Sequence, residues 1–181
     1  RMNPSLRLPE LPFRKITLAN GLDVIAMRAG LLPIVAVNLW YHVGSKNERP
    51  DRTGFAHLFE HMMFQGSKHA DGEYITYVEK AGANLREGGV NGTTSFDRTN
   101  YFETVPREAL EYALWLESDR MGFLTDALTQ EKFDNQRDVV KNEKRQSYDN
   151  RPYGSFYEKL MAAVFPPGHP YHHTPIGSME D

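Results

Sequence analysis

Two histidines and a glutamate share one short segment, HLFEH, which runs from His57 to His61. On an α-helix, positions four apart differ by about 40° around the axis, and a residue three positions on lies on the same side. His57 and His61 can therefore direct imidazole nitrogens at one cation, with Glu60 beside them. Two imidazoles and one carboxylate, with a position left for water, form a catalytic zinc site, and a nearby carboxylate can accept the proton of that water. The spacing predicts a metal-dependent hydrolase with Glu60 as the base.

A purely structural role is the alternative for these three residues. Ordinary helix residues with satisfied hydrogen bonds also produce this short pattern, and it occurs by chance. The surroundings argue for chemistry, because the neighbouring side chains are apolar: Phe55, Leu58, Phe59, Met62 and Met63. Burying two imidazoles and a carboxylate among them costs several kcal/mol unless a metal or another partner compensates.

A third ligand is expected from another element. Between residues 129 and 148 one helical face carries Phe133, Gln136, Val140, Glu143 and Ser147. Glu143 thus shares an inward face with apolar residues and requires a cation, either a metal or the side chain of an Arg or Lys. Glu117 is the competing candidate, because it also interrupts an apolar stripe.

The elements that must position these residues follow from periodicity and turn signals. Asn20-Gly21 predicts a hairpin turn within residues 14–30, and Thr53 is expected to cap the helix that carries the two histidines. We expect strands at 34–45, 91–96 and 99–105, and helices at about 54–64, 71–82, 107–123, 129–148 and 155–165. The helix after Pro106 has an expected inward stripe of Leu110, Ala113, Leu114, Glu117 and Met121. This order favours the α+β class, with a mixed or antiparallel sheet and helices packed on one face.

Composition excludes several classes of protein. The 181 residues are 40% hydrophobic and 25% charged with a net charge of −3, which suits one globular domain and gives no basic field for nucleic acid. Without cysteine, thiolate zinc and a cysteine nucleophile are excluded. No segment is long and apolar enough for a membrane span. The first residue is Arg, so we expect a processed or partial chain. His172 and His173 are expected to be solvated.

Several motifs together resemble the pitrilysin family, which includes insulin-degrading enzyme and the mitochondrial processing peptidases. HxxEH is the inverzincin signature. The likeness extends through TLANGLDVIAM, GSKNERPDRTGFAHLFEHMMFQGS, NGTTSFDRTNYF, QRDVVKNEKRQ and HPYHHTPIGSMED, in the family's order. It implies a fold similar to the metallohydrolase domain of mitochondrial processing peptidase, and a zinc metalloendopeptidase.

The resemblance also implies roles for individual residues. His57, His61 and Glu143 would hold one Zn²⁺ per chain, and Glu60 would activate the zinc-bound water. Gln136 stands where active members often carry an acidic residue that hydrogen-bonds near the metal, and an amide cannot hold negative charge there. A peptide substrate would bind as an added edge strand along Asn91, Gly92, Thr93 and Thr94. The alternative for that segment is a structural strand whose Asn91-Gly92 is merely a turn.

The family architecture is larger than residues 1–181. The resemblance implies that these residues are the N-terminal zinc-binding domain, truncated at its C-terminal side, and that a downstream non-catalytic half or partner subunit is absent. The isolated piece would then be weakly active or inactive. The resemblance suggests a periplasmic location, while a cytoplasmic one stays open. Two other functions remain: a non-catalytic peptide-binding or assembly subunit of the same family, and a metal hydrolase acting on a small molecule.

Overall fold

The computed structural model describes residues 11–28, 30, 32–85 and 88–181 and divides the chain into two units, residues 1–33 and 34–181. The first unit contains an antiparallel hairpin of β1 (Phe13–Thr17) and β2 (Asp23–Met27). Gly21 has a φ of +88° at the turn, a conformation that glycine adopts without strain. Thr17 and Lys15 both contact the Asp23 carboxylate. The predicted hairpin and its turn are confirmed.

The second unit is built on a three-stranded antiparallel sheet. Its strands are β3 (Ile34–Tyr41), β6 (Val90–Thr94) and β7 (Thr99–Pro106), in the order β3-β7-β6. Among the described residues β6 is therefore an outer strand, paired through Asn91↔Phe102 and Thr94↔Thr99. Alternate residues of β7 point into the core, as the burial of Tyr101, Glu103 and Val105 shows.

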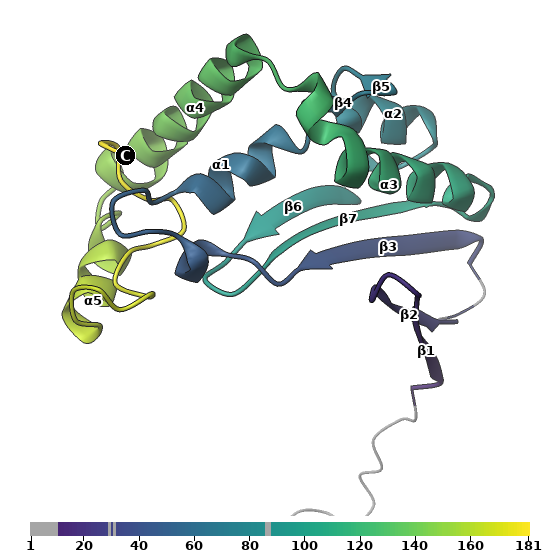
Figure 1. The fold of residues 1–181 in the computed structure, drawn as a ribbon, viewed down its shortest axis with the longest axis horizontal. Coiled ribbons are helices and arrows are strands. Elements are labelled where there is room, and N and C mark those ends of the chain that lie inside the picture. Colours follow the sequence, from purple (N-terminus) through teal and green to yellow (C-terminus); the bar gives the residue numbers. More distant parts are fainter. Residues whose placement is uncertain (1–10, 29, 31, 86–87) are drawn as a thin grey trace, which may run out of the picture. The chain divides into compact units, whose positions relative to one another are not determined.

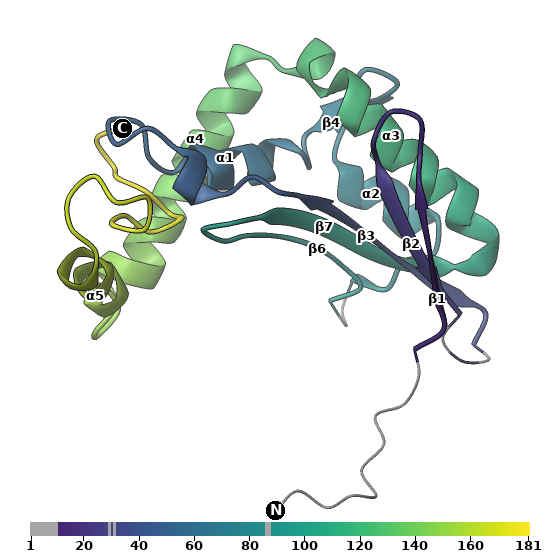
Figure 2. The ribbon, with the colours of Figure 1, turned by 60° about the horizontal axis from the view of Figure 1, so that its bottom comes forward.

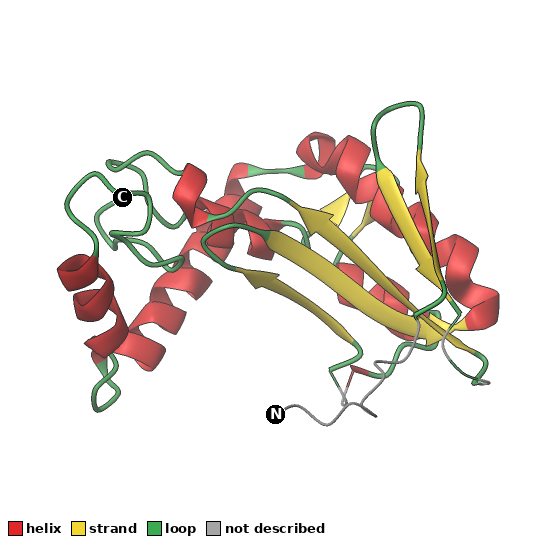
Figure 3. Ribbon diagram, turned by 90° about the horizontal axis from the view of Figure 1, so that it is seen from below, coloured by secondary structure: helices red, strands yellow, loops and turns green. Residues whose placement is uncertain are grey.

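Helices cover one face of this sheet (Figure 1). They are α1 (Phe55–Met62), α2 (Tyr74–Lys80) and α3 (Leu110–Ala127), and a second view keeps all three on the same side of the strands (Figure 2). Seen from below, the strands lie in front of the helices (Figure 3). A short hairpin of β4 (Gly66–Ser67) and β5 (Ala70–Asp71) links α1 to α2. The expected α+β class with helices on one face is confirmed.

The helices that follow α3 begin with α4, which packs against α1. They are α4 (Gln130–Lys144), a π-helical turn η4 (Arg145–Asp149) and α5 (Phe156–Val164), while short 3-10 helices η1 (Ser45–Asn47) and η3 (Arg107–Ala109) precede α1 and α3. Thr129 caps α4 by accepting a hydrogen bond from the Lys132 amide. No described helix combines the length and the apolar character needed to cross a membrane.

The larger core lies between the sheet, α2 and α3. Its buried members are Ala70, Tyr74, Val78, Ala83, Val105, Ala113 and Leu116. A smaller cluster joins the end of α1 to α3 and β7 through Met63, Leu124 and Tyr101. These contacts hold α1 against the sheet. One face of α1 therefore contacts β6 and β7, and another contacts α4.

The expected inward stripe of α3 is wrong in part. Leu114 and Met121 are about half exposed, at 50% and 47%, whereas Leu116 and Arg120 are almost completely buried. The Arg120 guanidinium lies over the ring of Tyr74, at 3.9 Å from its centroid, and pairs with Glu117. Arginine thus occupies part of the inward face, which an apolar pattern does not anticipate.

Two helix starts also differ from expectation. Helix α2 begins at Tyr74 rather than 71, because the chain first pairs Gly66 with Asp71 in the β4–β5 hairpin. Thr53 does not cap α1: the N-cap is Gly54, and the Thr53 hydroxyl instead donates to Asp181. The amides at the start of α1 instead donate to the carboxylate of Glu48, a residue that precedes the helix in the sequence.

Candidate metal centre

The structure brings His57 and His61 of α1 together with Glu143 of α4. One nitrogen of each imidazole and one carboxylate oxygen lie within 4.8 Å of one another. Glu143 Oε2 is 3.7 Å from His57 Nε2 and 3.4 Å from His61 Nε2. The two imidazole rings are 4.8 Å apart and nearly perpendicular, at 89°. Helices α1 and α4 therefore supply three converging donors.

The inward face of α4 explains why Glu143 arrives there. Gln136 and Val140 are buried on that face, with Glu143 one turn beyond them, as the sequence predicts. Gln136 lies beside His61 and contributes to raising the pKa of that imidazole. Glu117, the competing candidate, is elsewhere: it accepts from Arg120 Nε at 2.8 Å and from the Tyr74 hydroxyl.

The three groups have complementary electrostatics. Burial lowers the pKa of His57, so its imidazole is favoured in the neutral form that binds a metal. Hydrogen bonding with Glu143 raises the pKa of His61, and the same contact lowers the pKa of Glu143. The carboxylate thus remains ionised and is 42% exposed at the side chain, compared with 14% for His57.

Glu60 lies on the sheet side of α1 and is 9% exposed. Burial raises its pKa, and a hydrogen bond from Thr94 opposes this effect. The Thr94 hydroxyl donates to Glu60 Oε2 at 2.5 Å. A carboxylate with a raised pKa, close to a set of candidate metal ligands, is suited to accept a proton near neutral pH.

Strand β6 passes directly beside Glu60. A Cβ added at Gly92 would lie 3.1 Å from both Cγ and Oε1 of Glu60 and 3.1 Å from Phe64 Cε2. A side chain at position 92 would therefore require Glu60 or Phe64 to move by a few tenths of an ångström. Asn91 is exposed, and its side chain accepts a hydrogen bond from the Gly92 amide. The structure places the Asn91–Thr94 segment at the sheet edge near the candidate metal ligands, and Thr94 borders the same cavity as His57 and Glu143.

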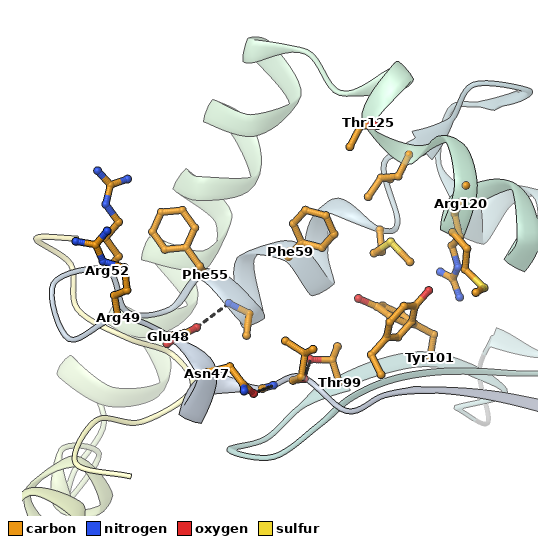
Figure 4. A pocket seen from close by; sticks show the side chains of 18 residues that line it. Asn47, Glu48, Arg49, Arg52, Phe55, Phe59, Thr99, Tyr101, Arg120 and Thr125 are labelled. Carbon is orange, nitrogen blue, oxygen red and sulfur yellow. Dashed lines mark hydrogen bonds between the residues drawn. The ribbon is translucent and has the colours of Figure 1, made fainter. Parts of the chain in front are cut away.

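Two cavities lie on opposite faces of α1. One, of about 380 Å³, is bordered by His57, Thr94 and Glu143 and opens the candidate metal centre to solvent. The other, of about 590 Å³, is mainly apolar and is bordered by Phe55, Phe59 and residues of α3 (Figure 4). The first cavity is the one associated with candidate chemistry.

Sequence patterns missed Glu48 and His173. The expectation that His173 is solvated is wrong: its side chain is 18% exposed and its Nε2 lies 3.0 Å from Glu48 Oε2. Glu48 is six positions before Gly54, too far for a capping-box pattern to identify it. Helix-start signals read only a few residues and do not detect such a long-range contact.

Comparison with known proteins gives consistent matches. The sequence model of insulinase (peptidase family M16) matches residues 24–170. The zinc protease PqqE of Helicobacter pylori is 36% identical over 168 residues, which cover 92% of this chain and 36% of that protein. Among solved structures, a protease from Helicobacter pylori has a TM-score of 0.85 at 34% identity, covering 94% of this chain and 39% of that one.

A further structure, the first half of the periplasmic protease PqqL from Escherichia coli, has a TM-score of 0.76 at 25% identity. The match covers 96% of this chain and 37% of that structure's chain. The chain therefore spans somewhat more than a third of the length of these similar proteins.

Proposed function

The chain belongs to the insulinase family, peptidase family M16, and on this premise we propose that it is the zinc-binding part of a metalloendopeptidase. Its relatives include zinc proteases, so zinc is used in the family. The observation that carries the proposal is the convergence of His57, His61 and Glu143, with Glu60 beside them.

The donor set fits zinc. Two imidazoles and one carboxylate are a catalytic zinc set, and bonds of about 2.1 Å in a tetrahedron separate ligand atoms by roughly 3.4 Å. The distances from Glu143 to the two histidines, 3.7 and 3.4 Å, are close to that value. We propose that His57, His61 and Glu143 hold one Zn²⁺. When bound, zinc acts as a Lewis acid toward a carbonyl and acidifies water.

Glu60 is proposed as the base. Its Oε2 accepts the Thr94 hydroxyl, which leaves Oε1, on the side of Gly92, to take a proton from the attacking water. The same oxygen can then pass the proton to the leaving amine. Burial of Glu60 supports both steps, because a raised pKa balances proton uptake against release.

A peptide is the proposed substrate, bound as an additional strand along β6. Within the described residues β6 has a sheet neighbour on one side only, β7. The backbone of Gly92, Thr93 and Thr94 would pair with the substrate, with Asn91 at the end of the strand. A peptide held there lies next to Glu60, since Thr94 and Gly92 both contact that side chain.

The short length of this chain relative to the similar proteins affects the activity expected of it. Because these two similar proteins are about two and a half times as long, we propose that residues 1–181 form an N-terminal zinc-binding domain that cooperates with a downstream domain or partner subunit. Alone, the domain would bind zinc but cleave peptides weakly. The periplasmic protease named among the similar structures supports a periplasmic location as part of the same proposal.

A non-catalytic, peptide-binding subunit is the second candidate, and one feature favours it. Gln136 is buried beside His61 and carries no charge. An amide at this position lacks the negative charge with which a carboxylate would strengthen metal binding. Peptide turnover by the zinc-loaded full-length protein decides between the two candidates.

Metal content tests the proposal directly. We expect one zinc per chain in the wild type, loss of zinc in Glu143→Ala, and retention in Glu131→Ala, a control at an exposed position of the same helix. Glu60→Gln should keep zinc and abolish hydrolysis of quenched fluorescent peptides in the full-length protein. A wild-type chain without zinc, or an active Glu60→Gln variant, contradicts the proposal.

A further inference from the structure

The first turn of α1 receives its cap from Glu48, a residue outside the helix. Both carboxylate oxygens are used: Oε2 accepts from the Gly54 amide at 2.9 Å and Oε1 from the Ala56 amide at 2.7 Å. Figure 4 shows Glu48 at the start of α1, with the bond to the helix backbone drawn as a dashed line. A negative charge at this end also complements the helix dipole.

His173 holds this carboxylate in place. Its Nε2 lies 2.9 Å from the Ser45 carbonyl oxygen and 3.0 Å from Glu48 Oε2. A carbonyl oxygen only accepts, so Nε2 carries a proton and donates. The Glu48 side chain is 5% exposed, and a buried carboxylate without a partner is costly. His173 therefore stabilises Glu48 in the orientation that caps α1.

The segment that carries His173 also contacts both helices of the metal centre. Gly177 is so close to the start of α1 that an added Cβ would lie 2.3 Å from the Gly54 amide nitrogen. Lys144, which follows Glu143 in α4, donates to the Gly177 carbonyl and to Glu158. The segment from His173 to Gly177 thus connects the first turn of α1 with the last turn of α4.

These two turns carry candidate ligands. His57 is the third residue of α1, within the turn that Glu48 caps, and Glu143 lies next to Lys144. We infer that Glu48 and His173 are positioning residues for the zinc site: they hold the first turn of α1 in its helical form and so keep His57 directed at Glu143. The expected effect on zinc affinity rests on the proposed function. The capping of α1 by Glu48 does not depend on a metal.

Two measurements on the protein separate the capping of α1 from its effect on zinc binding. Amide hydrogen exchange in metal-free protein reports the order of residues 54–58, and competition with a chelator gives the zinc dissociation constant. Loss of a helix cap lowers the equilibrium constant for forming the helix by a factor of roughly 2 to 30. We expect Glu48→Ala to speed exchange in this turn about tenfold and to weaken zinc binding about tenfold, with His173→Ala showing a smaller effect in the same direction.

Glu48→Gln is the conservative variant. Its one carbonyl oxygen replaces part of the carboxylate, so we expect partial rescue of both quantities, and this variant serves if Glu48→Ala does not fold. Thr53→Ala is the matched control, because Thr53 bonds to Ser178 and Asp181, which follow the His173–Gly177 segment, but its hydroxyl makes no bond to α1. We expect less than a twofold change in either quantity for it.

The outcomes are distinct. If Glu48→Ala lowers the unfolding midpoint but leaves both the exchange of residues 54–58 and the zinc affinity unchanged, the positioning role is overturned. If Thr53→Ala weakens zinc binding as much as Glu48→Ala, the effect is a general loss of stability and the inference is also overturned. A wild type that binds no zinc rejects the proposed function, while the exchange measurement still decides whether Glu48 caps the helix.

Discussion

Replacing Gly92 by alanine places a methyl group against the proposed base. The added Cβ would lie 3.1 Å from Cγ and Oε1 of Glu60, about 0.4 Å inside an optimal contact distance of roughly 3.5 Å. The Gly92 backbone does not require a positive φ, so alanine is acceptable there except for this contact and an equally short one, 3.1 Å, with Phe64 Cε2. Either Glu60 or β6 must therefore move by a few tenths of an ångström.

The displacement sets the expected effect on rate. A misplacement of about 1 Å can cost about 100-fold in rate, so a shift of about 0.4 Å corresponds to roughly a five- to tenfold loss. The methyl group points at Glu60 and away from the free strand edge. We therefore expect kcat to fall by this factor with little change in KM, and overpacking to reduce stability by about 1–3 kcal/mol.

The assay is steady-state hydrolysis of a quenched fluorescent peptide by the full-length protein, with zinc content and thermal unfolding measured on the same samples. Gly122→Ala in α3 is the control, because an added Cβ there meets no atom within 4 Å. A kcat within twofold of wild type in folded, zinc-loaded Gly92→Ala would refute the reasoning. A change in KM alone would show that the methyl group disturbs substrate binding instead of Glu60.

Three further predictions concern buried charged residues of β7 and α3. Burial, reinforced by the nearby Glu117 carboxylate, raises the pKa of Glu103 to about 9 from a usual 4.5. Because the folded-state pKa is the higher one, the stability linked to this group is fully present below about pH 4.5 and is lost as pH rises toward 9, a cost of about 3 kcal/mol at pH 7. Glu103→Gln should therefore stabilise the protein increasingly from pH 5 to 8 in urea unfolding, and a pH-independent difference from wild type contradicts this. Arg120→Met leaves Glu117 buried without its cation and should cost about 3–5 kcal/mol in the same assay, most of it recovered by Arg120→Met with Glu117→Leu; a loss below 1 kcal/mol argues against a tight buried pair. Asp119→Asn weakens the contacts that this buried carboxylate makes with the His69 ring and amide and should cost about 1–2 kcal/mol, while an unchanged unfolding midpoint means that these contacts contribute nothing.

Several features of this protein follow from local pattern alone. The i, i+3 and i+4 relations place His57, Glu60 and His61 on adjacent positions of one helix wherever that helix lies. The periodicity of α4 likewise places Glu143 on the same face as Gln136 and Val140. Alternation and turn residues predicted the hairpin and the strands for a similar reason, since each depends on residues only a few positions apart.

Tertiary structure decided what these local patterns leave open. The sequence allows Glu117 or Glu143 as the third candidate ligand, and the fold brings Glu143 to the two histidines, whereas Glu117 pairs with the inward-facing Arg120. It also assigns the α1 cap to Glu48 in place of Thr53, through a contact with His173 that is 125 positions away. Periodicity relates residues within a turn or two, whereas the pairing of distant charges depends on how the helices pack, and packing determines which carboxylates meet the histidines.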